Sequence, residues 1–294
     1  MNITATRFAT KTRTWLLIAG LTGLLIAIGA LIGGGFLYIF VALAVLMNVV
    51  GYWFSDKLAL KASRAKPVEP GTMPELERIV EDLAQRAQVP TPRLYLIASE
   101  QPNAFATGRN PKHAAVAVTD GLIQLLPRDQ VEGVLAHEFA HIKNRDILVS
   151  SIAAMVAGAI SAIANVLQFS LLFGGDDEDS GPLGLIGTLA TIILAPLAAA
   201  LLQLAVSRQR EYLADATGAQ LLGRGKPLAD ALESLERGAQ TVPMTVNPAT
   251  ASLYAVNPLP RTGVATLFMT HPPIAERIRR LRALDGDSSV RLVA

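Results

Sequence analysis

Long apolar segments alternate with polar stretches along this chain, and they come in two pairs. The first pair covers residues 15–32 and 36–54, separated by three glycines, and the second pair covers residues 147–173 and 183–206. Each segment is long enough to cross roughly 30 Å of hydrocarbon as a helix. The pattern therefore predicts four transmembrane helices, arranged as two hairpins.

Each pair has an alternative interpretation. The first segment could be a secretory signal peptide, but its apolar stretch is long, it lacks a small-residue cleavage site, and another apolar segment follows at once. The second pair could be buried core helices of a large soluble domain, although runs of this length without a charge are typical of membrane spans. The membrane interpretation is favoured for both pairs.

Composition agrees with a membrane protein and narrows the chemistry. Of 294 residues, 51% are hydrophobic and 17% are charged, which is more apolar than a typical soluble protein. The absence of cysteine excludes disulfides, iron–sulfur clusters, thiolate zinc ligands and a thiol nucleophile. A net charge of +2 gives no indication of a nucleic-acid partner. A bound metal would therefore need histidine and carboxylate ligands.

The basic residues lie mostly beside the apolar segments and predict an orientation. They are Arg7, Lys11 and Arg13 before the first span, Lys57, Lys61, Arg64 and Lys66 after the second, and Lys143, Arg145, Arg208 and Arg210 around the second hairpin. Neither hairpin loop carries Lys or Arg. By the positive-inside rule, both termini and the polar segments face the cytosol, and the acidic loop 176–179 faces the opposite side.

The polar segments have the composition of a globular domain. Residues 73–88 carry apolar side chains at helical spacing, and residues 128–146 predict a second helix that runs directly into the third span. Residues 93–97 and 113–119 predict short strands, joined by a turn-rich stretch at 103–108. We expect a small sheet beside helices.

The second of these helices carries a metal-binding pattern. His137 and His141 are four residues apart, so both imidazoles project from one face of the helix and can hold one zinc ion. Glu138 lies one step round the helix, beside the open position of the metal. It can take a proton from a zinc-bound water and later give it to the leaving amine.

A catalytic zinc needs a third protein ligand, and no further histidine follows at a short spacing. Glu211 follows the fourth span on the cytosolic side, with Asp215 four residues later on the same helical face. Glu211 can bind the metal, and Asp215 can orient a ligating histidine. A solvated or arginine-paired Glu211 is the alternative. Arg208 and Arg210 could pair with Asp215 or with a substrate, although the orientation signal already accounts for them.

These features predict a mostly α membrane protein with four transmembrane helices and a cytosolic α+β domain. An N-terminal transmembrane hairpin occupies residues 1–55, and a cytosolic catalytic segment with the zinc helix occupies 56–146. The second transmembrane hairpin occupies 147–206 and is inserted into the domain. A second catalytic segment, with the third ligand, occupies 207–294.

Several motifs occur together in a fixed order. After the first hairpin come residues 103–108, 137–141, the second hairpin, residues 211–215, and the stretch THPPIAERI at 270–278. In these motifs, over nearly its whole length, the chain resembles the membrane-bound HtpX metalloproteases, which are related to the CaaX prenyl proteases.

The resemblance implies a gluzincin-like fold, one zinc ion bound by His137, His141 and Glu211, and Glu138 as the general base. It also implies proteolysis of unfolded or misfolded membrane proteins in quality control, on the cytosolic side of the bacterial cytoplasmic membrane. The lipid bilayer is then a second partner. The oligomeric state stays open, and the acidic loop 176–179 is particular to this chain.

Two further groups are weaker candidates. His271 could donate a hydrogen bond to the oxyanion formed during peptide hydrolysis, or it could cap the helix that begins near the following prolines. Asn103, Ala104 and Phe105 lie next to a predicted strand. They could present an edge to which an extended substrate pairs, or form an ordinary loop.

Two other functions fit parts of the pattern. An intramembrane protease would place the His-Glu pair inside an apolar span, but here Glu132, Lys143 and Arg145 flank the motif. A scaffold with a structural zinc would need a fourth protein ligand, and Glu138 would then have no role. The sequence favours a protease that works at the membrane surface.

Overall fold

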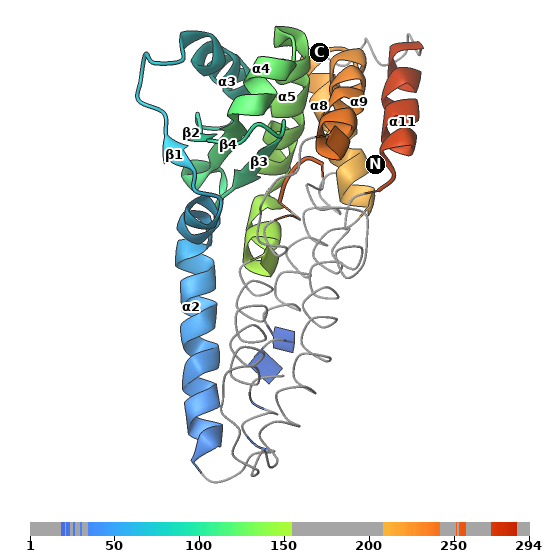
Figure 1. Ribbon diagram of the computed structural model, residues 1–294. Helices are drawn as coiled ribbons and strands as arrows, with labels where there is room; N and C mark the ends of the chain where they lie inside the picture. The colour runs from blue at the N-terminus through green and yellow to red at the C-terminus, as the bar shows by residue number, and fades with distance from the viewer. Residues whose placement is uncertain are drawn as a thin grey trace, which may run out of the picture.

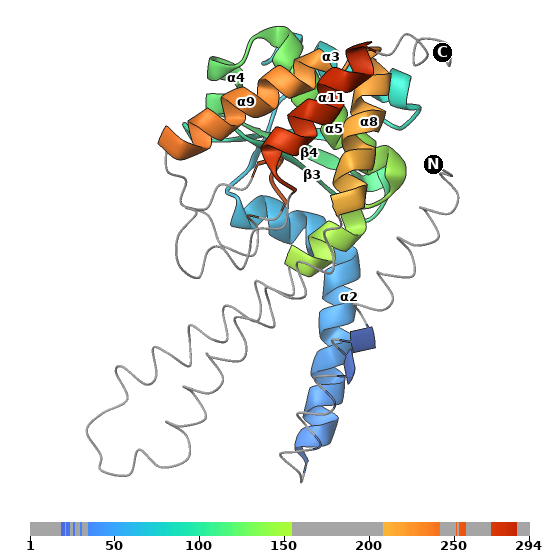
Figure 2. The same cartoon turned by 90° about the vertical axis from the view of Figure 1, so that its right-hand side faces the viewer.

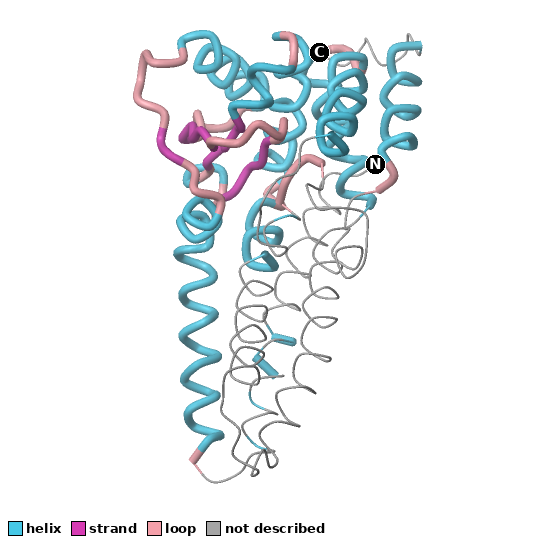
Figure 3. Tube along the Cα trace, viewed as in Figure 1, coloured by secondary structure: helices cyan, strands magenta, loops and turns pink. Residues whose placement is uncertain are grey.

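The computed structural model of the protein describes residues 35–154, 208–241, 253–256 and 272–286, with residue 251 and isolated positions between 19 and 30. Outside the described residues lie the predicted fourth span, most of the first and third spans, the acidic loop and His271. The described part is mostly helical with one small sheet (Figure 3), as expected.

One helix in the described part of the chain is long and apolar enough to cross a membrane. This helix, α2 (Phe36–Ala62), extends away from the other elements (Figure 1), and its apolar side chains Tyr38, Ile39 and Leu46 are more than half exposed. Such exposure is stable in lipid and unfavourable in water. The amide of Asn48 donates to the hydroxyl of Thr22 at 2.8 Å, so α2 contacts the preceding apolar segment.

Four strands form a mixed sheet in the order β1-β2-β4-β3. They are β1 (Lys66–Pro67), β2 (Arg93–Ile97), β3 (Ala104–Thr107) and β4 (Ala115–Thr119). The central strands β2 and β4 are parallel, and β1 and β3 pair antiparallel to them. Strand β4 is buried along its whole length, which explains its continuous apolar sequence.

The expectation for residues 103–108 was partly wrong, because this turn-rich stretch contains strand β3. All four residues of β3 are buried, so its sequence shows no alternation between polar and apolar side chains. The strand predicted at 113–119 begins two residues later, since Pro111–His113 form a short 3₁₀ turn, η1. The strand at 93–97 lies where the sequence predicts it.

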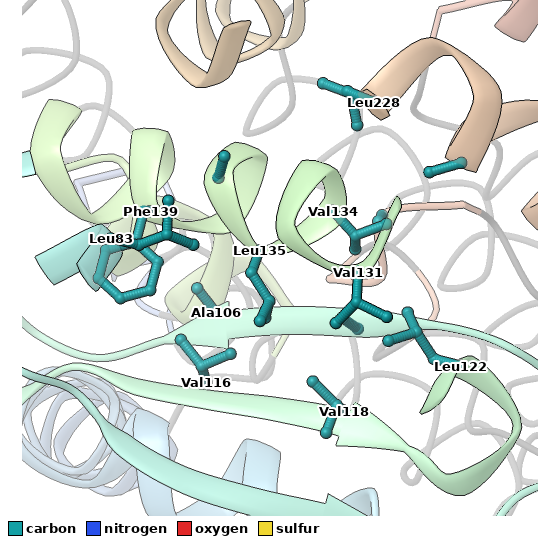
Figure 4. Packing of buried hydrophobic residues seen from close by; sticks show 14 of the residues in the cluster. Leu83, Ala106, Val116, Val118, Leu122, Val131, Val134, Leu135, Phe139 and Leu228 are labelled. Atoms are coloured by element: carbon teal, nitrogen blue, oxygen red, sulfur yellow. The ribbon is translucent and has the colours of Figure 1, made fainter. Parts of the chain in front are cut away.

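The two faces of the sheet pack against different parts of the chain. On one face, Val116 and Val118 contact a core that includes Val131 and Leu135 of helix α5 (Arg128–Asn144) (Figure 4). That core also contains α3 (Pro74–Ala87) and α4 (Asp120–Leu125). On the other face, Phe105 packs with the C-terminal end of α2 and with residues 253–254. The sheet therefore connects the apolar helix to the core around α5.

Helix α5 (Arg128–Asn144) lies between the sheet and a second group of helices, α8 (Arg208–Leu222), α9 (Lys226–Thr241) and α11 (Ile274–Gly286) (Figures 1 and 2). A Cβ atom on Gly133 would come within 2.7 Å of the backbone of Leu228. Glycine at this position lets α9 approach α5 closely.

Helix α5 does not continue directly into the third apolar segment, and this expectation was wrong. The helix ends at Asn144, Arg145 has a left-handed backbone with φ of 62°, and a new helix begins at residue 147. The amides of Arg145 and Asp146 bond back to the carbonyls of Ile142 and His141. This helix ending turns Asp146 back toward His141.

Candidate active site

Helix α5 places His137, Glu138 and His141 at the centre of the domain. Val134 and Phe139 are fully buried in the core and fix the rotation of the helix about its axis. The side chains of His137 and His141 face α8, and the side chain of Glu138 faces the edge strand β3. His137 and Glu138 are buried, and the side chain of His141 is 17% exposed, so the site is not closed to solvent.

Helix α8 brings Glu211 to the same place. Its carboxylate oxygens lie 3.8 Å from Nε2 of His137 and 3.6 Å from Nε2 of His141, and the two Nε2 atoms are 3.1 Å apart. Close packing of the helices makes this possible, because a Cβ atom on Gly218 would meet the backbone nitrogen of His137 at 3.0 Å.

These three residues fit a zinc ion. Ligand atoms at zinc–ligand distances of about 2.0–2.1 Å in a tetrahedron stand about 3.3 Å apart, close to the distances between the donor atoms of His137, His141 and Glu211. Three protein donors leave a fourth position for water and substrate. The set contains two imidazoles and one carboxylate, which are suited to zinc among the common divalent ions.

Each histidine is held by its own carboxylate. Nδ1 of His137 lies 2.9 Å from Asp215, and Nδ1 of His141 lies 3.2 Å from Asp146. A carboxylate at Nδ1 keeps the proton there and leaves Nε2 free to bind a metal. The sequence predicts the Asp215 contact. It does not predict the Asp146 contact, which depends on the break after α5.

Arg277 completes the surroundings of His137, and no motif in the sequence analysis predicts this role. Its guanidinium forms two hydrogen bonds to Asp215, at 2.9 and 2.7 Å, and one to the carbonyl of Ala255 at 3.1 Å. The residue is fully buried. Burial alone would raise the pKa of Asp215, but Arg277 outweighs it and lowers this pKa to about 2. Arg277 lies in the stretch THPPIAERI at 270–278, and this motif is the feature of the sequence that could have identified it as a site residue.

Buried negative charge predominates in the site. Burial raises the pKa of Glu138 to about 8. Burial would lower the pKa of His141, but the charges of Asp146, Glu211 and Glu138 outweigh it and raise this pKa to about 10. The pKa of His137 is lowered, chiefly by burial. A divalent cation would balance these carboxylates and return Glu138 toward its ionised form.

Glu138 also contacts strand β3, which contains two of the predicted substrate-binding residues, Ala104 and Phe105. Its Oε2 accepts a hydrogen bond from the backbone N–H of Ala106 at 2.7 Å, and the carbonyl of Ala104 accepts one from Ala255 at 2.9 Å. Both groups lie on the edge of β3 that faces away from β4. A substrate backbone can therefore pair with β3 only by exchanging these contacts or by pairing beyond them.

Two of the remaining predicted residues, Asn103 and Phe105, contact residues 254 and 256. The side chain of Asn103 is buried and donates to the carbonyl of Val256 at 2.7 Å, and Phe105 stacks edge-on against Tyr254. Their role in substrate binding, with that of Ala104, stays a prediction. The arginine that pairs with Asp215 in the structure is Arg277. His271 lies outside the described residues.

Comparison with known proteins agrees with this geometry. The profile of peptidase family M48 matches residues 70–285. A "Protease HtpX homolog" of Syntrophobacter fumaroxidans is 53% identical over 279 residues, covering 92% of this chain and 98% of that protein. A protein of the same name from Pyrococcus furiosus is 50% identical over 274 residues, covering 92% and 95%. The crystal structure of S. mikatae Ste24p matches with a TM-score of 0.50 at 23% identity, over 94% of this chain and 67% of that one, which shows a shared fold.

Proposed function

Because the chain belongs to peptidase family M48 and is a metalloprotease, we propose that it is a zinc endopeptidase anchored in a membrane by its apolar helices. The observation that carries this proposal is the set of three donors, His137, His141 and Glu211, with Glu138 beside it. The proposed substrates are unfolded or misfolded membrane proteins, cut on the cytosolic side.

The residues around the site have separable tasks. His137, His141 and Glu211 would hold the zinc ion, which lowers the pKa of water and polarises a substrate carbonyl. Glu138 accepts the proton of the attacking water and passes it to the nitrogen of the leaving amine. The N–H of Ala106 holds the Glu138 carboxylate in place during this transfer.

The position of the site supports cleavage outside the membrane. Helix α2 extends away from the domain that contains the histidines (Figure 1), and the basic residues Lys57, Lys61 and Arg64 lie at the domain end of α2. A polypeptide would therefore reach the site from the aqueous side. Because the chain has no cysteine, a single cysteine in place of the exposed Glu81 would report this orientation. It should react with a membrane-impermeant maleimide only in inside-out vesicles.

The decisive experiment compares the wild type with Glu138→Gln on an unfolded model protein, with zinc content measured on both. Glutamine can still accept the hydrogen bond from Ala106 but cannot take a proton. We expect the zinc content to stay at one ion per chain and cleavage to fall by about 100-fold or more.

The matched control is Glu132→Gln, the same change on the same helix at a residue that pairs with Arg128 near the surface. It should cleave like the wild type. If Glu138→Gln also cleaves like the wild type, the activity belongs to another site or to a contaminant, and the protease mechanism proposed here is wrong.

A further inference from the structure

A basic pocket lies where the apolar helix meets the catalytic domain, and none of its lining residues belongs to the metal site. It has a volume of about 540 Å³. Its lining comes from the end of α2, the start of β2 and the segment between β3 and β4. The lining residues are Trp53, Phe54, Asp56, Lys57, Thr91, Arg93, Arg109, Lys112, His113 and Ala114.

The pocket lies at the depth where a membrane surface would be. Residues 36–54 form the apolar part of α2, and Trp53 and Phe54 end it with side chains that are 50% and 45% exposed. Aromatic side chains at the end of a span are typical of the headgroup region. Lys57 follows one turn later. The opening of the pocket therefore faces lipid headgroups if α2 spans the bilayer.

Positive charge in the pocket exceeds negative charge. Four cations line it with one acid, Asp56, which pairs with Arg93 at 2.7 Å. Among the described residues, no carboxylate forms an ion pair with Lys57, Arg109 or Lys112. These three cations can therefore receive an anion from outside the chain.

Arg109 is held in place before any ligand arrives. Its guanidinium stacks over the ring of Trp53, 4.7 Å from the ring centre, and donates to Nε2 of His113 at 2.8 Å. Nδ1 of His113 in turn bonds to the side chain of Asn110 at 2.8 Å, which fixes the ring. Because a guanidinium has five N–H donors, most remain for a ligand. A fixed arginine loses little freedom on binding a phosphate.

We propose that this pocket binds the phosphate of an anionic phospholipid headgroup, with Lys57, Arg109 and Lys112 as its ligands and Trp53 against the adjoining acyl chains. Three unpaired cations favour an anionic headgroup over a zwitterionic one, because the ammonium group of the latter would meet like charge. The proposal rests on the membrane anchorage proposed above and is independent of the metal site.

The test uses the full chain in phosphatidylcholine nanodiscs that contain increasing fractions of brominated phosphatidylglycerol. The chain has two tryptophans, so Trp15→Phe leaves Trp53 as the reporter that the bromine quenches. We expect half-quenching at an at least tenfold lower fraction of brominated phosphatidylglycerol than of brominated phosphatidylcholine. Each cation raises the affinity for the anionic lipid roughly fivefold. The triple variant Lys57→Gln, Arg109→Gln, Lys112→Gln should therefore lose the preference for phosphatidylglycerol.

A second triple variant, Lys61→Gln, Arg64→Gln, Lys66→Gln, removes the same charge at the same end of α2 but outside the pocket. It should keep the preference. Equal losses in both triple variants would mean general attraction to a basic surface, and equal quenching by both lipids would mean acyl-chain contact alone. Either result overturns the proposal. The double variant Lys57→Arg, Lys112→Arg keeps the charge and leaves the stacked Arg109 in place, so it should keep binding, which guards against an effect of misfolding.

Two additional measurements are needed. The first distinguishes a lipid phosphate from free phosphate as the ligand, and the second distinguishes failure of the lipid site from failure of the protease mechanism. Inorganic phosphate at the concentration of lipid phosphate should not abolish the preference; if it does, the site takes free phosphate. Cleavage of the unfolded protein is measured in the same nanodiscs. Selective quenching without proteolysis leaves the lipid site standing and rejects the protease mechanism, whereas a chain that does not enter nanodiscs rejects the anchorage and the lipid site together.

Discussion

At the scale of single residues, the two histidines of the metal site depend on carboxylates from different parts of the chain. Asp146 reaches Nδ1 of His141 at 3.2 Å only because the backbone reverses at Arg145. Replacing Asp146 by Asn keeps the shape and removes the charge. We expect zinc affinity to fall by about tenfold, measured by competition with a chelator, because the carboxylate no longer orients and polarises the imidazole. Asp129→Asn, at an exposed position in the first turn of α5, is the control, and an equal loss there would contradict this role.

Arg277 gives a second residue-scale prediction. Arg277→Met leaves the buried carboxylate of Asp215 without its cation, a change that typically costs about 3–5 kcal/mol of stability. We expect lower stability by denaturant titration together with a fall in zinc affinity of about tenfold or more, since Asp215 holds His137. Arg279→Met removes an exposed arginine on the same helix. It should change neither quantity, and an Arg277 variant that resembles it would show that the buried pair does not position the histidine.

The sequence reveals some of these residues and not others for a physical reason. His137, Glu138 and His141 belong to one turn of one helix, so their spacing alone places them together. Arg277 lies three residues after Ile274 and four before Leu281, so helical spacing places it on the apolar face of α11. Spacing within α11 does not identify its partner, because Asp215 belongs to α8 and only the packing of the two helices brings them together.

At the scale of elements, the site depends on how closely α5 and α8 pack. The close approach at Gly218 lies two turns after Glu211 on the same helix. Gly218→Val should push α8 away from α5, reduce stability by about 1–3 kcal/mol through overpacking, and lower zinc affinity because Glu211 moves with the helix. Ala216→Val places the same side chain on the exposed face of α8 and should leave zinc binding unchanged. If both variants bind zinc equally, the close approach is not what positions Glu211.

The elements also show where sequence patterns lose information. Helix α3 has one polar and one apolar face, whereas α5 is buried on all sides from residue 133 to 140, and the predicted bounds of both helices lie within two residues of those observed. Strand β3 is buried on all sides and has neighbours that favour turns, so periodicity cannot identify it. Strand β1 has two residues, too few for any pattern. The elements that were missed or misread border the site, since β3 contacts Glu138 and the end of α5 presents Asp146.

At the scale of the whole molecule, a metal ion would join parts of the chain that the sequence separates. His141 and Glu211 lie on opposite sides of the predicted second hairpin, residues 147–206, so the site combines residues that are far apart in the chain. A shared ion would link α5 to α8 and also balance their carboxylates. At a free zinc concentration about 1,000 times its Kd, binding adds about 4 kcal/mol to stability. For a domain of this size, that corresponds to a rise in Tm of roughly 8–16 °C.

Chelation should therefore lower the Tm of the detergent-purified wild type by about this amount, and added zinc should restore it. Glu211→Gln should melt at the same temperature with and without zinc, because two histidines on one helix do not link α5 to α8. The apolar core around Val116, Leu135 and Leu232 contains no metal ligand, so the metal-free protein should keep its helical circular dichroism below that melting temperature. The opposite outcome is an unchanged Tm of the wild type after a metal assay has shown that its zinc is removed. That result would mean that the ion contributes to catalysis alone and that the packing of α8 on α5 is sufficient to hold the site together.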